Sequence, residues 1–200
     1  FAHYDKLISA YAVAEWSKPY FNNRALFSDY YLTDRLPHDA LWNDPAVSTA
    51  MTSAYRQLRD IIAGTLAPFA GQPEETIRAA LIEPTLRLLG FTPQPATTPH
   101  ADAVVPDYRL FAATHTGDDT RPLALCLAYP WNRNLDAKDD QRDQRRPDDN
   151  PGASVVTLLD SGEADWAIVT NGKLWRLYAA NAHSRATNYY EIDLEETLAL

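Results

Sequence analysis

The sequence predicts an α/β domain with a central mixed β-sheet flanked by helices and preceded by an amino-terminal helical segment. Three observations predict this fold class. The chain up to Gly90 has mainly helical periodicity, the hydrophobic period then changes to that of strands, and the pair Asn171-Gly172 between two apolar runs is a strong β-hairpin signal. The resulting order is helices, two strands, a crossover helix, a hairpin and a closing strand, which is typical of a mixed sheet.

The composition is that of one ordinary globular domain, with 200 residues, 46% hydrophobic residues and a net charge of -9. This charge argues against attraction of the whole chain to DNA or anionic lipid. The single cysteine, Cys126, excludes a disulfide framework and fits a cytoplasmic location, and no apolar run approaches the ~18 residues of a membrane span. Because the chain starts at Phe1 rather than at a methionine, we expect it to be part of a longer chain.

Residues 1–70 are predicted to form a helical, aromatic-rich amino-terminal segment. Apolar side chains recur at helical spacing over residues 3–18 and again over residues 46–68. Residues 19–45 between them are rich in aromatic rings and have few regular signals, so we expect this stretch to pack on its surroundings through those rings.

Residues 71–200 are predicted to form the α/β domain, joined to the first segment in one compact unit. A helix is expected from Pro73 to Leu89, with Gly90 as its carboxyl-terminal cap. Pro84 lies inside this helix and is expected to bend or break it.

Strand signals follow the helix. Residues 104–111 are expected to form a strand interrupted by Pro106, and residues 123–129 a continuous apolar strand of the fully buried type. Residues 136–149 are strongly charged and are expected to be an exposed loop or a fraying helix end.

A helix capped by Asn150 and ended by Gly162 leads to the last three strands. Residues 164–170 and 173–179 are expected to form the hairpin, and residues 188–194 the closing strand.

Several short segments of the chain form a recognisable set, of which residues 166–178 around the hairpin turn are the most specific. The set is residues 26–32, Arg35-Leu36-Pro37, residues 84–91, Pro106-Asp107-Tyr108, residues 132–136, Asn150-Pro151, residues 166–178 and residues 189–194. Together they resemble the amino-terminal nuclease region of single-chain type IIG and IIL restriction-modification enzymes, which carry an N6-adenine methyltransferase downstream, and of related phage-defence proteins. The resemblance covers the chain from about residue 26 to its end.

The resemblance implies a PD-(D/E)xK, or restriction-endonuclease-like, fold. In that family an acid ends one strand, a second acid lies on the next strand, and a lysine follows two positions after the second acid. Because side chains alternate along a strand, the second acid and the lysine share one face and point at the same metal ion and attacking water. The carboxylates hold Mg²⁺, which polarises the phosphate and makes hydroxide available.

The sequence departs from this pattern at the positions that carry the chemistry. Asp107 stands where the family has its first acid, but Leu127 and Tyr129 stand at the positions of the second acid and the lysine. Ser154 stands where the family's helix usually brings a glutamine. One carboxylate without a partner is a poor magnesium site. We therefore expect a nuclease fold without catalytic residues, with Asp107 as a relic, and no metal or other cofactor in this segment.

An alternative hypothesis keeps the activity. Asp136-Ala137-Lys138 spells D-x-K downstream of Asp107, so a shifted register predicts a Mg²⁺-dependent DNA endonuclease that uses Asp107, Asp136 and Lys138. Against it, Asp136 lies past the apolar run, where the strand is expected to have ended. Convergence of the three side chains in a structure would favour this alternative.

Four arginines are candidates for contact with a nucleic-acid backbone: Arg133, Arg142, Arg145 and Arg146. The last three are interleaved with aspartates, so a solvated charge run is the favoured interpretation. A third hypothesis is a pure interaction module that docks a partner through the aromatic segment 20–42, which an exposed contiguous patch of rings would favour.

The resemblance also implies a function. We expect a catalytically degenerate nuclease-like domain of a bacterial restriction-modification or phage-defence DNA methyltransferase, acting as a structural, DNA-proximal or partner-docking module. Its expected partners are DNA, which it reaches through the parent protein, and either a downstream methyltransferase domain or subunits of a defence system. No association with a membrane is expected. The segment carries neither the Asn/Asp-Pro-Pro-Tyr/Phe motif of adenine methyltransferases nor a phosphate-cradling glycine-rich loop, so methylation is expected to lie outside these residues.

Overall fold

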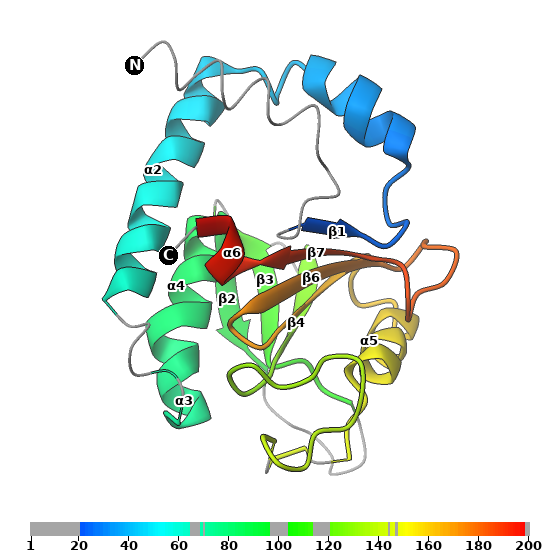
Figure 1. Cartoon of the computed structure of the whole chain (residues 1–200). Coiled ribbons are helices and arrows are strands. Elements are labelled where there is room, and N and C mark those ends of the chain that lie inside the picture. Colours follow the sequence, from blue (N-terminus) through cyan, green and yellow to red (C-terminus); the bar gives the residue numbers. More distant parts are fainter. Residues whose placement is uncertain are drawn as a thin grey trace.

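The computed structural model describes residues 21–64, 69, 71–96, 104–113, 121–143, 145–146 and 148–198. In this part of the chain a seven-stranded mixed sheet forms the centre of the molecule, with the strand order β1-β7-β6-β5-β4-β3-β2 (Figure 1). Among the seven strands of the described residues, β4 and β5 pair in parallel and the other neighbouring pairs are antiparallel. The predicted α/β class with a central mixed sheet is therefore confirmed. The strands are β1 (Phe21–Asn23), β2 (Phe91–Pro95), β3 (Tyr108–Ala112), β4 (Ala124–Ala128), β5 (Trp166–Thr170), β6 (Leu174–Ala179) and β7 (Tyr189–Asp193).

Helices cover both faces of the sheet. On one face α3 (Glu74–Ile77), the π-helical turn η3 (Arg78–Ile82) and α4 (Glu83–Leu88) form one continuous helical rod. On the other face α5 (Pro151–Asp160) makes the crossover between β4 and β5. The short helix α6 (Leu194–Leu198) follows β7. No helix of the described residues is long and apolar enough to cross a membrane.

Strand β4 separates two apolar clusters, and it is buried along its whole length. Ala124, Cys126 and Ala128 belong to the cluster under α3, η3 and α4, whereas Leu125 and Leu127 belong to the cluster under α5. This is the two-residue period of a strand with helices on both faces, and it explains why the sequence shows a continuous apolar run here.

Pro84 changes the winding of its helix without ending it. The Glu83 N–H donates to the carbonyl of Arg78, five residues earlier, so the helix widens into the π-helical turn directly before the proline. A proline has no N–H to give and its ring crowds the carbonyl four residues earlier, and the wider turn accommodates both effects. The helix then ends at Leu88, and Gly90, whose φ is +86°, follows in the capping position that the sequence predicts.

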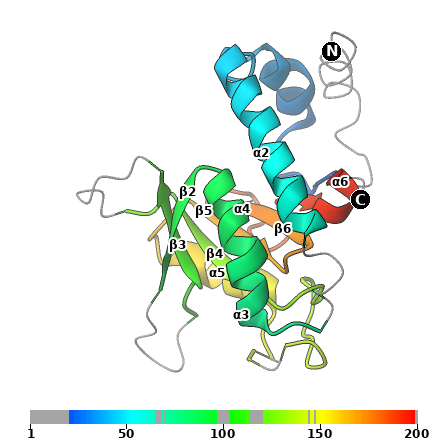
Figure 2. The ribbon, with the colours of Figure 1, turned by 90° about the vertical axis from the view of Figure 1, so that its left-hand side faces the viewer.

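The aromatic stretch is more regular than its sequence suggests. β1 adds an edge strand to β7, and the π-helical turn η1 (Tyr31–Arg35) and the 3₁₀ turn η2 (Leu36–His38) follow it. The helix α2 (Pro45–Ala63) then extends away from the sheet, in both views, and Ile62 near its end is its one fully buried residue (Figures 1 and 2). The helix predicted over residues 3–18 lies outside the described residues.

The predicted hairpin is confirmed, and its turn packs against the loop that follows β4. The Asn171 side chain donates to the carbonyl of Arg133 (2.7 Å) and accepts the N–H of Leu174 (2.7 Å). Gly172 has φ +83°, and a Cβ built on it would lie 2.8 Å from Cε3 of Trp131. The turn therefore requires glycine twice, for its backbone conformation and for the close approach of the indole ring.

We predict that Gly172→Ala lowers the free energy of unfolding by about 2 kcal/mol, because the substitution adds backbone strain and a clash with Trp131. The matched control is Gly162→Ala. Gly162 also has a positive φ (+71°), but no atom lies within 4 Å of a Cβ built there, so only the backbone strain of about 1 kcal/mol is expected. Urea unfolding of both variants measures the difference. Equal losses of stability in the two variants would show that Trp131 moves away from the added methyl group without destabilising the fold.

Candidate functional site

Asp107 lies immediately before β3, beside the carboxyl-terminal end of β4. Its backbone N–H donates to the carbonyl of Cys126 (2.8 Å), and its Oδ2 accepts the N–H of Ala128 (2.7 Å). The side chain is 7% exposed. Asp107, which the sequence resemblance predicts as a first acid, is therefore held where β3 begins and β4 ends, and it is almost completely removed from water.

Three arginines surround this carboxylate. Nη2 of Arg78, from η3, lies 2.9 Å from Oδ1, Nη2 of Arg146 lies 3.1 Å from Oδ2, and Arg145 also binds Oδ1. Burial by itself raises the pKa of Asp107, but the guanidinium groups of Arg146, Arg78 and Arg145 outweigh it and hold this pKa below the ordinary value of 3.8. Asp107 is therefore ionised at neutral pH and fully engaged with cations of the same chain.

The Arg146 guanidinium also binds the neighbouring backbone. Its Nη2 donates to the carbonyl of Ala128 (2.7 Å) as well as to Asp107, so one nitrogen bridges a carboxylate oxygen and a backbone carbonyl. Arg78 donates to the same carbonyl (2.8 Å). Carboxylate and carbonyl oxygens are the ligands of hard divalent cations. Here the cations between them are guanidinium groups, and the described residues contain no cluster of three or more His, Cys, Asp or Glu side chains that could hold a metal ion.

The positions of the family's second acid and lysine both face α5. Leu127 is 1% exposed and belongs to the apolar cluster of β4, β5 and α5. Tyr129 is fully buried in the same cluster, and burial raises the pKa of its hydroxyl well above the ordinary value of 10. One position is thus an ordinary core residue, and the other carries a neutral hydrogen-bond donor.

Asp149 joins two of the expected active-site positions. It accepts hydrogen bonds from the hydroxyl of Tyr129 (2.6 Å) and from the hydroxyl of Ser154. The Tyr129 ring lies between the guanidinium groups of Arg133 and Arg146, whose central carbons are 4.6 and 4.3 Å from its centroid. In the sequence Asp149 is one more charge of the run over residues 136–149, and nothing local marks it as the acceptor for Tyr129.

The four candidate arginines have different environments. Arg133 forms an ion pair with Asp143 (2.8 Å) in which both side chains are 0% exposed, and it donates to three backbone carbonyls. It has no exposed surface from which to contact a nucleic acid in this structure. Arg142 is exposed and donates to the carbonyl of Asn132 (3.1 Å). The other two face the buried carboxylate, so the loop is only partly the solvated charge run that its composition favours.

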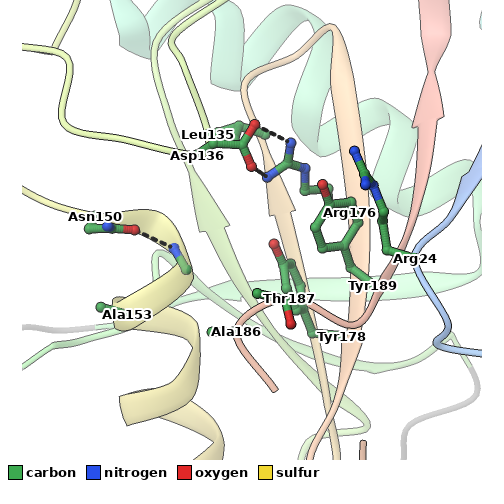
Figure 3. A pocket seen from close by; sticks show the side chains of 11 residues that line it. Arg24, Leu135, Asp136, Asn150, Ala153, Arg176, Tyr178, Ala186, Thr187 and Tyr189 are labelled. Atoms are coloured by element: carbon green, nitrogen blue, oxygen red, sulfur yellow. Dashed lines mark hydrogen bonds and ion pairs between the residues drawn. The ribbon is translucent and has the colours of Figure 1, made fainter. Parts of the chain in front are cut away.

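The residues of the alternative catalytic site each have a separate partner. Asp136 binds the Arg176 fork through both oxygens, at 2.7 and 3.0 Å (Figure 3). Lys138 pairs with Asp148 at 3.1 Å, with both side chains largely exposed. Asp107 is occupied by its arginines, as described above. The Arg176 hydrogen bonds hold the pKa of Asp136 below 3.8. These contacts do not favour a shared metal site.

The aromatic segment is partly packed and partly exposed. Phe27 lies against Tyr190 of β7, with ring centroids 5.9 Å apart. In contrast Tyr30 is 63% exposed, Tyr31 41% and Trp42 38%. Tyr20 lies outside the described residues. The rings after β1 therefore leave apolar surface in contact with solvent, as the third hypothesis requires of at least part of the segment.

No family model matches this chain, and no match is found among curated proteins or solved structures. The chemistry of the site is therefore inferred from its own residues.

We predict that Asp107→Asn lowers the free energy of unfolding by about 3 kcal/mol at neutral pH, because it removes the buried carboxylate that three guanidinium groups share. Glu74 remains beside Arg78 and Arg145, and Asp149 remains beside Arg146. The matched control is Asp148→Asn, which breaks an exposed ion pair and is expected to change stability by less than about 0.5 kcal/mol. Chemical denaturation measures both. A change at Asp107 as small as that at Asp148 would identify it as a relic without a structural role.

The same contacts predict a pH dependence. The pKa of Asp107 in the folded state lies below its ordinary 3.8, so the ionised carboxylate stabilises the fold at pH values above 3.8. This stabilisation is lost as the pH falls through the folded-state pKa. The stability difference between the wild type and Asp107→Asn is therefore expected to be largest at neutral pH and to shrink below pH 3.8. Unfolding curves between about pH 2 and 7 measure it; a difference that is constant with pH would contradict the ionic origin.

Proposed function

We propose that this chain is a restriction-endonuclease-like domain that has lost its cutting chemistry and serves as a scaffold in a bacterial DNA-modification or phage-defence protein. The single observation that carries the proposal is the Arg146 nitrogen that bridges the Asp107 carboxylate and the Ala128 carbonyl. An internal guanidinium there satisfies the oxygens to which a divalent metal ion would bind.

The arrangement of the neighbouring strands supports the nuclease-like part of the proposal. Asp107 lies next to the end of β4, and Leu127 and Tyr129 are two positions apart at that end and share the α5 face. A nuclease of this family needs an acid and a lysine with this spacing and on one face. The side chains present supply neither a second carboxylate nor an amine.

The residues around Asp107 do not fit Mg²⁺. This ion prefers several oxygen ligands in octahedral geometry, whereas the carboxylate here faces Arg78, Arg145 and Arg146. A guanidinium remains protonated and does not activate a water molecule as a metal ion does. The guanidinium groups therefore neutralise the Asp107 carboxylate, as a metal ion would, but they cannot activate a water molecule.

Scaffolding of the parent protein is the role that remains for such a domain. The net charge of -9 does not favour strong binding of DNA by this segment alone. The exposed Tyr30 and Trp42 supply apolar surface for packing against a methyltransferase region or a partner subunit. The domain would then lie near DNA without cutting it.

We predict no metal-dependent cleavage of DNA. The purified chain is incubated with supercoiled and linear DNA, methylated and unmethylated, in the presence of Mg²⁺ or Mn²⁺. Wild type and Asp107→Ala are expected to leave the DNA equally intact, because neither holds a catalytic metal ion. Cleavage that requires the metal ion and disappears in Asp107→Ala would overturn the proposal, and loss of that cleavage in Asp136→Ala and Lys138→Ala would establish the rearranged nuclease instead.

Isothermal titration with Mg²⁺ gives a second readout that does not depend on the choice of DNA sequence. The wild type is expected to show no heat that is absent from Asp107→Asn. Tight binding that depends on Asp107 would contradict the proposal even if no DNA substrate were cut.

A further inference from the structure

A second polar site lies on the α5 side of the sheet, apart from the Asp107 cluster. It is an open hollow of about 490 Å³, lined by five stretches of chain: the turn after β1, the loop after β4, the start of α5, β6, and the β6–β7 turn with β7 (Figure 3). Sites for small organic ligands have volumes of roughly 300–1,000 Å³, and they commonly form where several segments meet. The hollow is therefore large enough for a ligand of nucleotide size.

Arg176 forms one wall of the hollow and is held in place independently of any ligand. Its side chain is 4% exposed, its Nε donates to Glu191 (2.5 Å), and its guanidinium lies over the Tyr189 ring at 4.3 Å. These contacts fix the side of the guanidinium that faces the sheet. The two terminal nitrogens of Arg176 face the hollow and are available to a group inside it.

Asp136 occupies those two nitrogens. It accepts from both, at 2.7 and 3.0 Å, yet its own side chain is 67% exposed. It belongs to the loop after β4, and its backbone N–H is held by the Asn134 side chain (2.8 Å). Because the carboxylate lies mostly in water, it can turn away from Arg176 with little loss of packing, and Glu191 remains as the counter-ion of Arg176. The Asp136 carboxylate therefore occupies the two terminal nitrogens of Arg176, but it is free to exchange with another anion.

Arg24 supplies a second cation to the hollow. Its backbone N–H is tied to the carbonyl of Tyr189 (2.8 Å), while its exposed guanidinium forms no ion pair or hydrogen bond with any residue that the structure describes. Figure 3 shows this side chain beside Tyr189 and close to Arg176. The start of α5 lines the opposite wall and adds positive potential, although the Gly152 N–H is already capped by Asn150 (3.1 Å).

We propose that this hollow binds a phosphate monoester of nucleotide size, with the phosphate held by Arg24 and Arg176 and with Asp136 as the group that it displaces. A planar carboxylate needs only one guanidinium fork, whereas the three free oxygens of a phosphate can accept from two guanidinium groups that approach from different elements. When Asp136 turns away, two arginines face the single carboxylate of Glu191, which leaves room for an added anion. This site does not depend on the nuclease-like interpretation of the fold.

Isothermal titration with deoxyadenosine 5′-monophosphate, and with inorganic phosphate, tests the proposal. The wild type is expected to bind the nucleotide more tightly than inorganic phosphate. Asp136→Ala is expected to strengthen nucleotide binding about tenfold, because the competing carboxylate is gone. Arg24→Ala is expected to weaken it about tenfold, the loss of one charge-assisted contact. Benzoate, a planar carboxylate, is not expected to compete.

The matched control is Arg121→Ala, which removes an exposed arginine whose partner is Asp165, outside the hollow, and is expected to leave binding unchanged. Arg24→Ala is also expected to fold normally, because the exposed Arg24 guanidinium forms no hydrogen bond or ion pair with a described residue, and thermal unfolding checks this. Unchanged nucleotide binding in both Arg24→Ala and Asp136→Ala would overturn the site. Equal affinities for phosphate and nucleotide would overturn the nucleotide size of the ligand, and competition by benzoate would overturn its phosphate character.

Discussion

The burial of Asp107 among guanidinium groups is the interaction on which the rest of the site depends. Its carboxylate connects the start of β3 to η3 through Arg78, to β4 through the Ala128 N–H, and to the charged loop through Arg145 and Arg146. A buried ion without its partner destabilises a protein by about 3–5 kcal/mol. Each of these elements therefore needs the others to be in place, and the loop after β4 is held against the sheet by these charges as well as by the apolar packing of Trp131 and Leu135.

A guanidinium can replace the positive charge of a metal ion but not its ability to bind a water molecule. It neutralises the carboxylate and donates to the nearby carbonyl, as Arg146 does, but it offers no open position for a water molecule. The positions at which the sequence resemblance places a second acid and a lysine carry neither group, since they are Leu127 and Tyr129. Tyr129 and Ser154 instead share Asp149 as their acceptor, and these polar contacts fill the space with satisfied hydrogen bonds.

The sequence predicts elements well where one local signal is decisive. Asn150 caps α5 through the N–H of Gly152, and the Asn171-Gly172 turn joins β5 to β6, both as expected. The two edge strands are missed. β1 is only three residues long, and β2 (Phe91–Pro95) contains prolines at alternate positions, which an edge strand tolerates. Both strands are defined by pairing with a partner elsewhere in the chain and not by their own pattern.

By itself the sequence determines the hydrophobic periods, the caps and the turn, and it determines that positions 127 and 129 carry neither a carboxylate nor an amine, since they are Leu127 and Tyr129. Only the tertiary structure decides which charges of the loop after β4 are buried and what they bind. Arg146 and its carboxylate partner are 39 residues apart in the chain, and the buried Arg133 and Asp143 look no different in sequence from their exposed neighbours. A charge run specifies polarity at each position, whereas burial of a charge depends on a counter-ion that the fold brings from elsewhere.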